Sequence, residues 1–223
     1  MDAAKKLLVV LGATGYQGGS VVQEFLKSPQ YRVRAITRNT SLPKAQTLAR
    51  QGAEVAQADF NNATSLVEAF QGAHAIYLVT NFWDDTSNPH IELEQGKRAI
   101  DIASSIQTLE HLTWSALPSI TEVSSGKYKH VIHYDSKAEV TQYLREKKSE
   151  LWERTTVLWI AAYFQMWYQF PELLGPQKQD DGPFVLKRVG GKDAKCPYVD
   201  VTETRKVVRA IIEKGKTLRG KIV

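Results

Sequence analysis

The 223-residue sequence predicts an α/β domain built on a doubly wound parallel sheet. Short apolar runs rich in β-branched residues alternate with amphipathic segments of helical period, and the connections between them are short. A glycine-rich turn also joins the first apolar run to the first amphipathic segment, as in a βαβ unit. The length suits one such domain with a small appended lobe.

The first two thirds of the chain alternate regularly between the two kinds of segment. Apolar runs of strand length predict strands at 6–11, 31–37, 53–58, 74–80 and 109–115. Apolar residues at helical spacing predict helices at 17–27, 44–51, 63–70 and 90–105. Three of these helices end where a helix breaker follows, at Pro29, Gly52 and Gly72.

The last third is less regular. Serine, glycine and proline predict a loop over 116–129, and a polar loop is expected over 176–183. Helical spacing predicts helices at 135–148 and 202–214, and residues 155–160 form a sixth apolar run of strand length. The aromatic stretch 163–174 is expected to be helical with a break near Pro171.

Composition excludes several classes of protein. The longest apolar run, 157–164, falls well short of the roughly 20 residues needed to cross a bilayer, so we expect no membrane span. The net charge of +5 comes without a basic stripe interleaved with aromatics, so no nucleic-acid partner is expected. Cys196 is the single cysteine and the histidines lack metal-ligand spacing, which predicts no disulfide or metal site and fits a cytoplasmic or nuclear location.

The glycine turn has the spacing G-x-x-G-x-x-G and lies between a strand and a helix. A pyrophosphate needs backbone N–H donors that side chains do not cover, and the last glycine lets the helix pack closely on the strand. This context predicts a Rossmann-type dinucleotide site. The predicted contacts in the turn are Gly12, Thr14, Gly15, Tyr16, Gln17 and Gly18.

The end of the second predicted strand indicates which dinucleotide binds. NAD sites usually place a carboxylate there, whereas NADP sites place a positive charge for the 2′-phosphate. Arg38 follows this strand and residues 35–39 contain no carboxylate, which predicts NADP; the alternative is a solvated arginine.

The ends of the third and fourth strands point into the same crevice. Asp59 and Phe60 are expected near the adenine, and Thr80, Asn81 and Phe82 near the nicotinamide ribose. Asp59 and Asn81 equally suit turns and helix caps.

These motifs, together with Trp114–Ser119 and the stretch 133–140, resemble the NmrA-like family, an atypical branch of the short-chain dehydrogenase/reductase superfamily, in its fungal form. The resemblance implies an NADP(H)-binding Rossmann domain at 1–160. Members continue past the position of Val223, so it also implies a truncated or minimal substrate-side lobe at 161–223, packed on the same domain.

The resemblance also bears on catalysis. Typical short-chain dehydrogenases use Ser, Tyr and Lys, with Tyr and Lys four residues apart on one helix face. Family likeness places the ribose-binding lysine at Lys137 and His133 at the tyrosine position, with Ser115 near the reacting atom. Tyr163 is another possible proton donor. A second pair, Tyr143 and Lys147, has the literal spacing but lies further along the helix.

Two functions follow as expectations. One is an NADP-dependent oxidoreductase that reduces a carbonyl or imine of a small apolar metabolite, such as one of secondary metabolism; the aromatic stretch 159–170 favours it. The other is a non-catalytic NADP(H)-sensing regulator, or redox sensor, that acts through protein partners. The missing tyrosine favours the regulator.

Overall fold

The computed structural model describes residues 4–187 and 193–223. Its centre is a seven-stranded sheet in the order β3-β2-β1-β4-β5-β6-β11, and every neighbouring pair is parallel. The strands are β1 (Lys6–Val10), β2 (Tyr31–Thr37), β3 (Glu54–Gln57), β4 (Ala75–Leu78), β5 (His111–Ala116), β6 (Thr155–Trp159) and β11 (Lys221–Ile222). The predicted doubly wound parallel sheet is therefore confirmed, and its order reverses between β1 and β4, where such sheets bind ligands.

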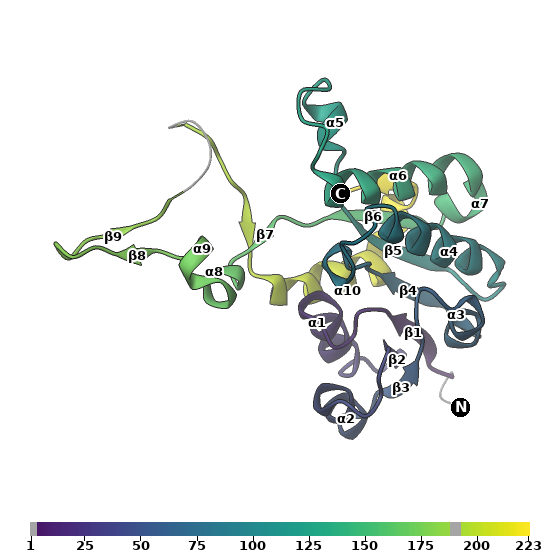
Figure 1. The fold of residues 1–223 in the computed structure, drawn as a ribbon. Helices are drawn as coiled ribbons and strands as arrows, with labels where there is room; N and C mark the ends of the chain where they lie inside the picture. Colours follow the sequence, from purple (N-terminus) through teal and green to yellow (C-terminus); the bar gives the residue numbers. More distant parts are fainter. Residues whose placement is uncertain (1–3, 188–192) are drawn as a thin grey trace.

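Helices cover both faces of this sheet (Figure 1). Successive residues of β1 point to opposite faces, so Leu7 and Val9 enter one apolar core while Leu8 and Val10 enter the other. The first core is closed by α3 (Ala63–Phe70), α4 (Ile91–Ser105), α6 (Ile132–Lys147) and α7 (Ser149–Trp152). The second is closed by α1 (Tyr16–Phe25), α2 (Pro43–Arg50) and α10 (Thr204–Lys214).

Three expectations for the last third of the chain are wrong in part, and one strand of the central sheet was missed. The predicted loop at 116–129 contains the one-turn helix α5 (Ile120–Val123), capped by the Ser119 side chain. The predicted helix at 163–174 has its expected break near Pro171, but it is reduced to the single turns α8 (Met166–Gln169) and α9 (Pro171–Leu174), and its first residue lies in β7 (Ala162–Tyr163). The predicted loop at 176–183 includes β8 (Gln177–Lys178), which pairs with β9 (Phe184–Val185). Strand β11 was not predicted, because two residues are too few to show a period.

The chain leaves the sheet after β6 and returns to it near α10. Figure 1 shows β7, α8, α9 and the β8–β9 hairpin reaching away from the body. The return runs through β10 (Tyr198–Val199), which pairs in parallel with β7, and through the short turn η2 (Val201–Glu203). Helix α10 and strand β11, joined by η3 (Gly215–Leu218), then complete the body. The predicted division at residue 160 stays a prediction.

Two further features matter below. His111 on β5 is buried, with Nε2 3.1 Å from the Thr156 hydroxyl, and burial lowers the pKa of its imidazole to about 4. Across the described ranges 4–187 and 193–223, no helix combines the length and apolar character that a bilayer crossing demands.

Candidate functional site

The glycine turn lies at the carboxyl end of β1, next to the point where the strand order reverses. Gly12 has a φ of +63°, a conformation that favours glycine, and its carbonyl accepts a hydrogen bond of 2.9 Å from Gly15 N. A Cβ on Gly18 would stand 2.4 Å from the Gly12 oxygen, so α1 could not pack here with any larger residue. The close helix packing expected of Gly18 is therefore present.

The start of α1 offers free backbone donors. Gly15 is its N-cap and provides no side-chain cap, and the first turn carries no acidic residue. The N–H groups of this turn and the positive end of the helix dipole are therefore available to an anion. Gly15 and Tyr16 are exposed, so an incoming phosphate can approach them. The glycine turn fits a pyrophosphate on these grounds.

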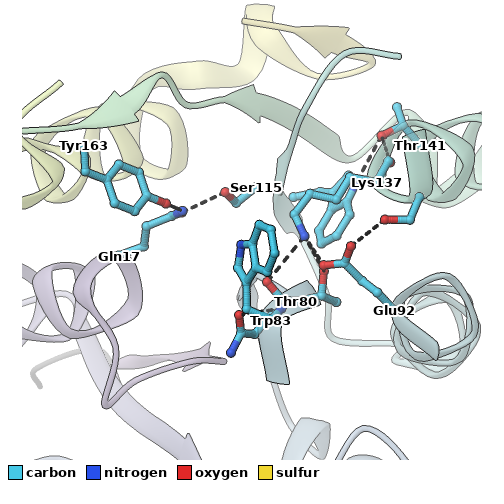
Figure 2. Close-up of polar contacts among 11 residues, drawn as sticks. Gln17, Thr80, Trp83, Glu92, Ser115, Lys137, Thr141 and Tyr163 are labelled. Carbon is cyan, nitrogen blue, oxygen red and sulfur yellow. Dashed lines mark hydrogen bonds and ion pairs between the residues drawn. The ribbon is translucent and has the colours of Figure 1, made fainter. Parts of the chain in front are cut away.

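Gln17, in the first turn of α1, connects three hydroxyl groups, and Figure 2 shows two of them, those of Ser115 and Tyr163. Its Oε1 accepts hydrogen bonds from Ser115 Oγ at 2.7 Å and from the Tyr77 hydroxyl at 2.5 Å. Its Nε2 donates to the Tyr163 hydroxyl. The glycine turn, β4, β5 and β7 thus meet in one polar cluster, which we call the hydroxyl cluster (Gln17, Tyr77, Ser115, Tyr163).

Burial fixes the protonation of the two tyrosines in the hydroxyl cluster. It raises the pKa of Tyr77, which lies fully inside the core, and it raises the pKa of Tyr163. The hydrogen bond with Gln17 opposes the shift at Tyr163 without reversing it. Both phenols are therefore protonated at neutral pH and can act as proton donors.

Lys137 belongs to a second, separate polar cluster (Figure 2). Its ammonium forms an ion pair with Glu92 on α4 and lies 3.0 Å from the Thr80 hydroxyl. The Glu92 carboxylate also accepts hydrogen bonds from Thr80, at 2.7 Å, and from Ser136. All four side chains are buried, and we call this group the lysine cluster (Thr80, Glu92, Ser136, Lys137).

Burial and charge act in opposite directions on Lys137. Burial lowers the pKa of its ammonium more than the neighbouring Glu92 carboxylate raises it. The carboxylate partner thus offsets part of the desolvation cost that a lone buried ammonium would carry.

Ser115 and Lys137 lie on opposite faces of the sheet. Trp114 and Ser115 are consecutive on β5, so their side chains point in opposite directions. Trp114 packs in the core under α6 and donates a 3.0 Å hydrogen bond to Thr141, whereas Ser115 reaches α1. The structure therefore groups Ser115 with Tyr163, and Lys137 with Thr80.

His133 stands one turn before Lys137 on α6, in an aromatic setting. Its ring centroid lies 5.7 Å from that of Phe82 and 5.1 Å from that of Trp83. Burial, followed by the nearby Lys137 charge, lowers the pKa of the His133 imidazole. The ring is neutral at pH 7, so it is not a ready acid there.

The alternative pair lies at the other end of α6. The Tyr143 hydroxyl donates a 2.6 Å hydrogen bond to Asp101 near the end of α4, and this bond raises the pKa of Tyr143 to about 12. Lys147 is exposed. Helix α6 runs back from the carboxyl edge of the sheet, so this pair is remote from the glycine turn.

Arg38 follows β2 and forms an ion pair with Asp84. Its side chain is 60% exposed and that of Asp84 is 33% exposed. Residues 35–39 hold no carboxylate, but the fold brings one to Arg38 from beyond β4.

The remaining predicted contacts serve local structure. Asp59 accepts a 2.7 Å hydrogen bond from Asn61 N, and Asn81 caps the 3₁₀ turn η1 (Phe82–Asp84). The Phe60 carbonyl accepts from Arg98 at 2.6 Å. Thr14 is half-buried in the glycine turn.

Three site residues were absent from the sequence expectations: Tyr77, Asp84 and Glu92. Tyr77 reads as one more apolar residue of a buried strand. Glu92 lies in the same helix as the charged residues Glu94 and Lys97, so nothing in the sequence indicates that its side chain is the buried one. Asp84 meets Arg38 only through the fold.

The sheet order, the switch point and the glycine turn define a Rossmann-type α/β protein. The NmrA-like family pattern matches residues 4–223, and the chain belongs to that family. An NmrA-like family domain-containing oxidoreductase of Aspergillus hancockii, hkm9, is 34% identical over 217 residues. That match takes in 91% of this chain and 62% of the relative, so the chain spans less than two thirds of the relative's length.

Solved structures share the fold. The negative transcriptional regulator NmrA superposes with a TM-score of 0.82 at 22% identity, covering 99% of this chain and 66% of that protein. Structures of NmrA have also been solved in complex with NAD and with NADP. The NADPH-dependent quinone oxidoreductase QOR2 of Escherichia coli superposes with a TM-score of 0.68 at 20% identity, covering 97% of this chain and 68% of that one.

Proposed function

We propose that this chain is an NADP(H)-binding oxidoreductase that reduces a carbonyl or imine of a small apolar metabolite. The observation that carries the proposal is the hydroxyl cluster: Ser115 and Tyr163 are held by Gln17, a residue of the turn that would bind the pyrophosphate. Proton-donating groups therefore stand beside the cofactor turn itself. The relatives described as NmrA-like oxidoreductases support this reading.

Reduction of a carbonyl adds a hydride to carbon and a proton to oxygen. Bound NADPH would supply the hydride. The Tyr163 hydroxyl, kept protonated by burial, would supply the proton and be reprotonated from solvent. Ser115 would orient the substrate oxygen by redirecting to it the hydrogen bond that it donates to Gln17. The raised pKa keeps the Tyr163 phenol in the protonated form that reduction requires.

The cofactor's other contacts would come from the two edges of the crevice. Arg38 would pair with the 2′-phosphate, which favours NADP over NAD. Lys137 would hold the nicotinamide ribose, and its ion pair with Glu92 fixes where its ammonium stands. Aromatic side chains just beyond β6, Phe164 and Phe170 among them, are exposed and would offer an apolar ligand a surface.

A second candidate is a sensor that binds NADP(H) without turnover. One observation favours it: the position four residues before Lys137 holds a neutral histidine packed against aromatic rings. NmrA, a transcriptional regulator whose structures hold NAD or NADP, shows that the fold serves regulators too.

The test combines calorimetric titration of NADPH, NADP⁺, NADH and NAD⁺ with NADPH oxidation against ketones, imines and quinones. We expect NADP(H) to bind more tightly than NAD(H), and at least one compound class to be reduced. Tyr163→Phe should then lower kcat about 100-fold or more while the Kd of NADPH stays unchanged.

Tyr168→Phe is the matched control, because this tyrosine of α8 is 87% exposed. It should leave both kcat and Kd as they are. Tight NADPH binding without oxidation by any compound would favour the sensor. Equal activity of Tyr163→Phe and Tyr168→Phe would remove the hydroxyl cluster from the mechanism.

A further inference from the structure

The segment 81–90 lies between β4 and α4, at the carboxyl end of β4 where the proposed cofactor crevice begins, and we call it the crossing loop. It starts at the carboxyl end of β4, yet its residue Asp84 reaches Arg38 at the carboxyl end of β2. Strand β1 lies between those two strands, so the reach is about 10 Å, twice the spacing of neighbouring strands. The Arg38–Asp84 contact therefore spans the position of β1, the strand from which the glycine turn emerges.

The crossing loop is anchored at both sides of the crevice. On the β2 side the anchor is the Arg38–Asp84 ion pair. On the α6 side the rings of Phe82 and Trp83 contact His133. Between these anchors lies the crevice where the proposed cofactor would sit.

The ion pair has a direct consequence for cofactor choice. Arg38 is the group that would receive the 2′-phosphate of NADP, and Asp84 already holds it. A phosphate monoester dianion and a carboxylate cannot both bind one guanidinium closely without repelling each other. NAD has no 2′-phosphate and makes no such demand.

We propose that Asp84 is a specificity-determining residue that competes with the 2′-phosphate of NADP(H) for Arg38. This inference rests on the proposed function. Asp84 weakens NADP(H) binding and leaves NAD(H) binding unaffected. It therefore reduces the preference for NADP(H) over NAD(H) that Arg38 creates. Binding of NADP(H) releases the β2-side anchor of the crossing loop, whereas binding of NAD(H) leaves it closed.

The test is calorimetric titration of NADPH and NADH into wild type, Asp84→Asn, Arg38→Ala and the double variant. One unit charge pair at about 4 Å in water changes an equilibrium constant roughly fivefold, and the phosphate carries nearly two charges. Asp84→Asn should therefore tighten NADPH about 20-fold and change NADH less than twofold. In the Arg38→Ala background the gain in NADPH affinity caused by Asp84→Asn should be at least threefold smaller, because the guanidinium for which carboxylate and phosphate compete is absent.

Asp85→Asn is the matched control: it removes the same charge one residue away, from a side chain that holds Ser87 rather than Arg38. It should change neither affinity. An unchanged NADPH affinity in Asp84→Asn, or an equal gain for NADH, overturns the inference. If Arg38→Ala abolishes the NADPH preference in that case, the proposed function still stands. If wild type binds neither nucleotide, the proposed function fails as well.

Discussion

Glu92→Gln should destabilise the protein through the lysine cluster. Glutamine keeps the volume of the side chain and can still bond Thr80 and Ser136, but it removes the negative charge beside Lys137. Lys137 would then be a buried ammonium without a counter-charge. Breaking a buried pair in this way costs about 3–5 kcal/mol of unfolding free energy.

The deficit should depend on pH. Burial already lowers the pKa of Lys137, and loss of the carboxylate that raises it lowers this pKa further. Between that lowered pKa and the unfolded value near 10.4, the unfolded chain binds more protons than the folded one, so stability rises with pH. The variant should therefore recover part of its deficit between pH 7 and pH 9.5.

Urea denaturation of wild type and Glu92→Gln at both pH values measures these quantities. Glu94→Gln is the matched control, since Glu94 also lies in the first turn of α4 but is 62% exposed and 3.8 Å from Lys97. It should cost less than about 1 kcal/mol. The double variant Glu92→Gln/Lys137→Met should be more stable than Glu92→Gln alone. A loss below about 1 kcal/mol for Glu92→Gln, or one that does not vary with pH, would refute the reasoning.

Three other changes test the remaining features. Gly18→Ala should lower the free energy of unfolding by roughly 3 kcal/mol in urea denaturation, because its Cβ would stand 2.4 Å from the Gly12 oxygen. The control Gly19→Ala, whose Cβ would stand 3.2 Å from its nearest atom, should cost under about 1 kcal/mol. Similar costs for the two variants would contradict the packing argument. Wild type should lose about 3 kcal/mol between pH 6.5 and pH 4 as buried His111 is forced to protonate, and His111→Gln should lack that part of the slope; parallel slopes would assign it elsewhere. Gly15→Val should fold, because Gly15 has an ordinary φ of −90°, yet bind neither NADPH nor NADH in calorimetry; retained affinity would refute the role of the turn.

The sheet could be predicted because its signals are local. Most strands of the body, β1 and β4 above all, are buried apolar runs, and the helices between them show an apolar face in their own sequence. Strand β3 is only partly buried. The segment after β6 lacked such signals. Phe164, Tyr168 and Phe170 make 163–174 look like a packed helix with a break near Pro171, but in the structure these aromatics are exposed and only a single helical turn forms on each side of the break. Aromatic content alone does not show which surface the residues meet.

The part of the site that one loop forms could be predicted. The parts that depend on ion pairs between residues far apart in the sequence could not. The glycine turn is recognisable from its spacing together with the strand before it and the helix after it. The partner of Arg38 lies 46 residues away and that of Lys137 lies 45 residues away, so neither is visible along the chain. The resemblance to a family placed Ser115 and Lys137 in one site. Successive side chains of β5 point to opposite faces of the sheet, however, and Ser115 and Lys137 lie on different faces.

The pairing of β7 with β10 gives the outer segment the character of a module. Ala162 lies opposite Tyr198 and Tyr163 opposite Val199, so the chain departs and returns at one place. The residues between those two strands form a closed loop. Doubling the length of such a loop raises the entropy cost of closing it by only about 0.6 kcal/mol. Lengthening, shortening or exchanging the stretch 164–197 should therefore leave the sheet and glycine turn undisturbed. The fold can therefore change the residues that surround a ligand while the sheet and the glycine turn stay the same.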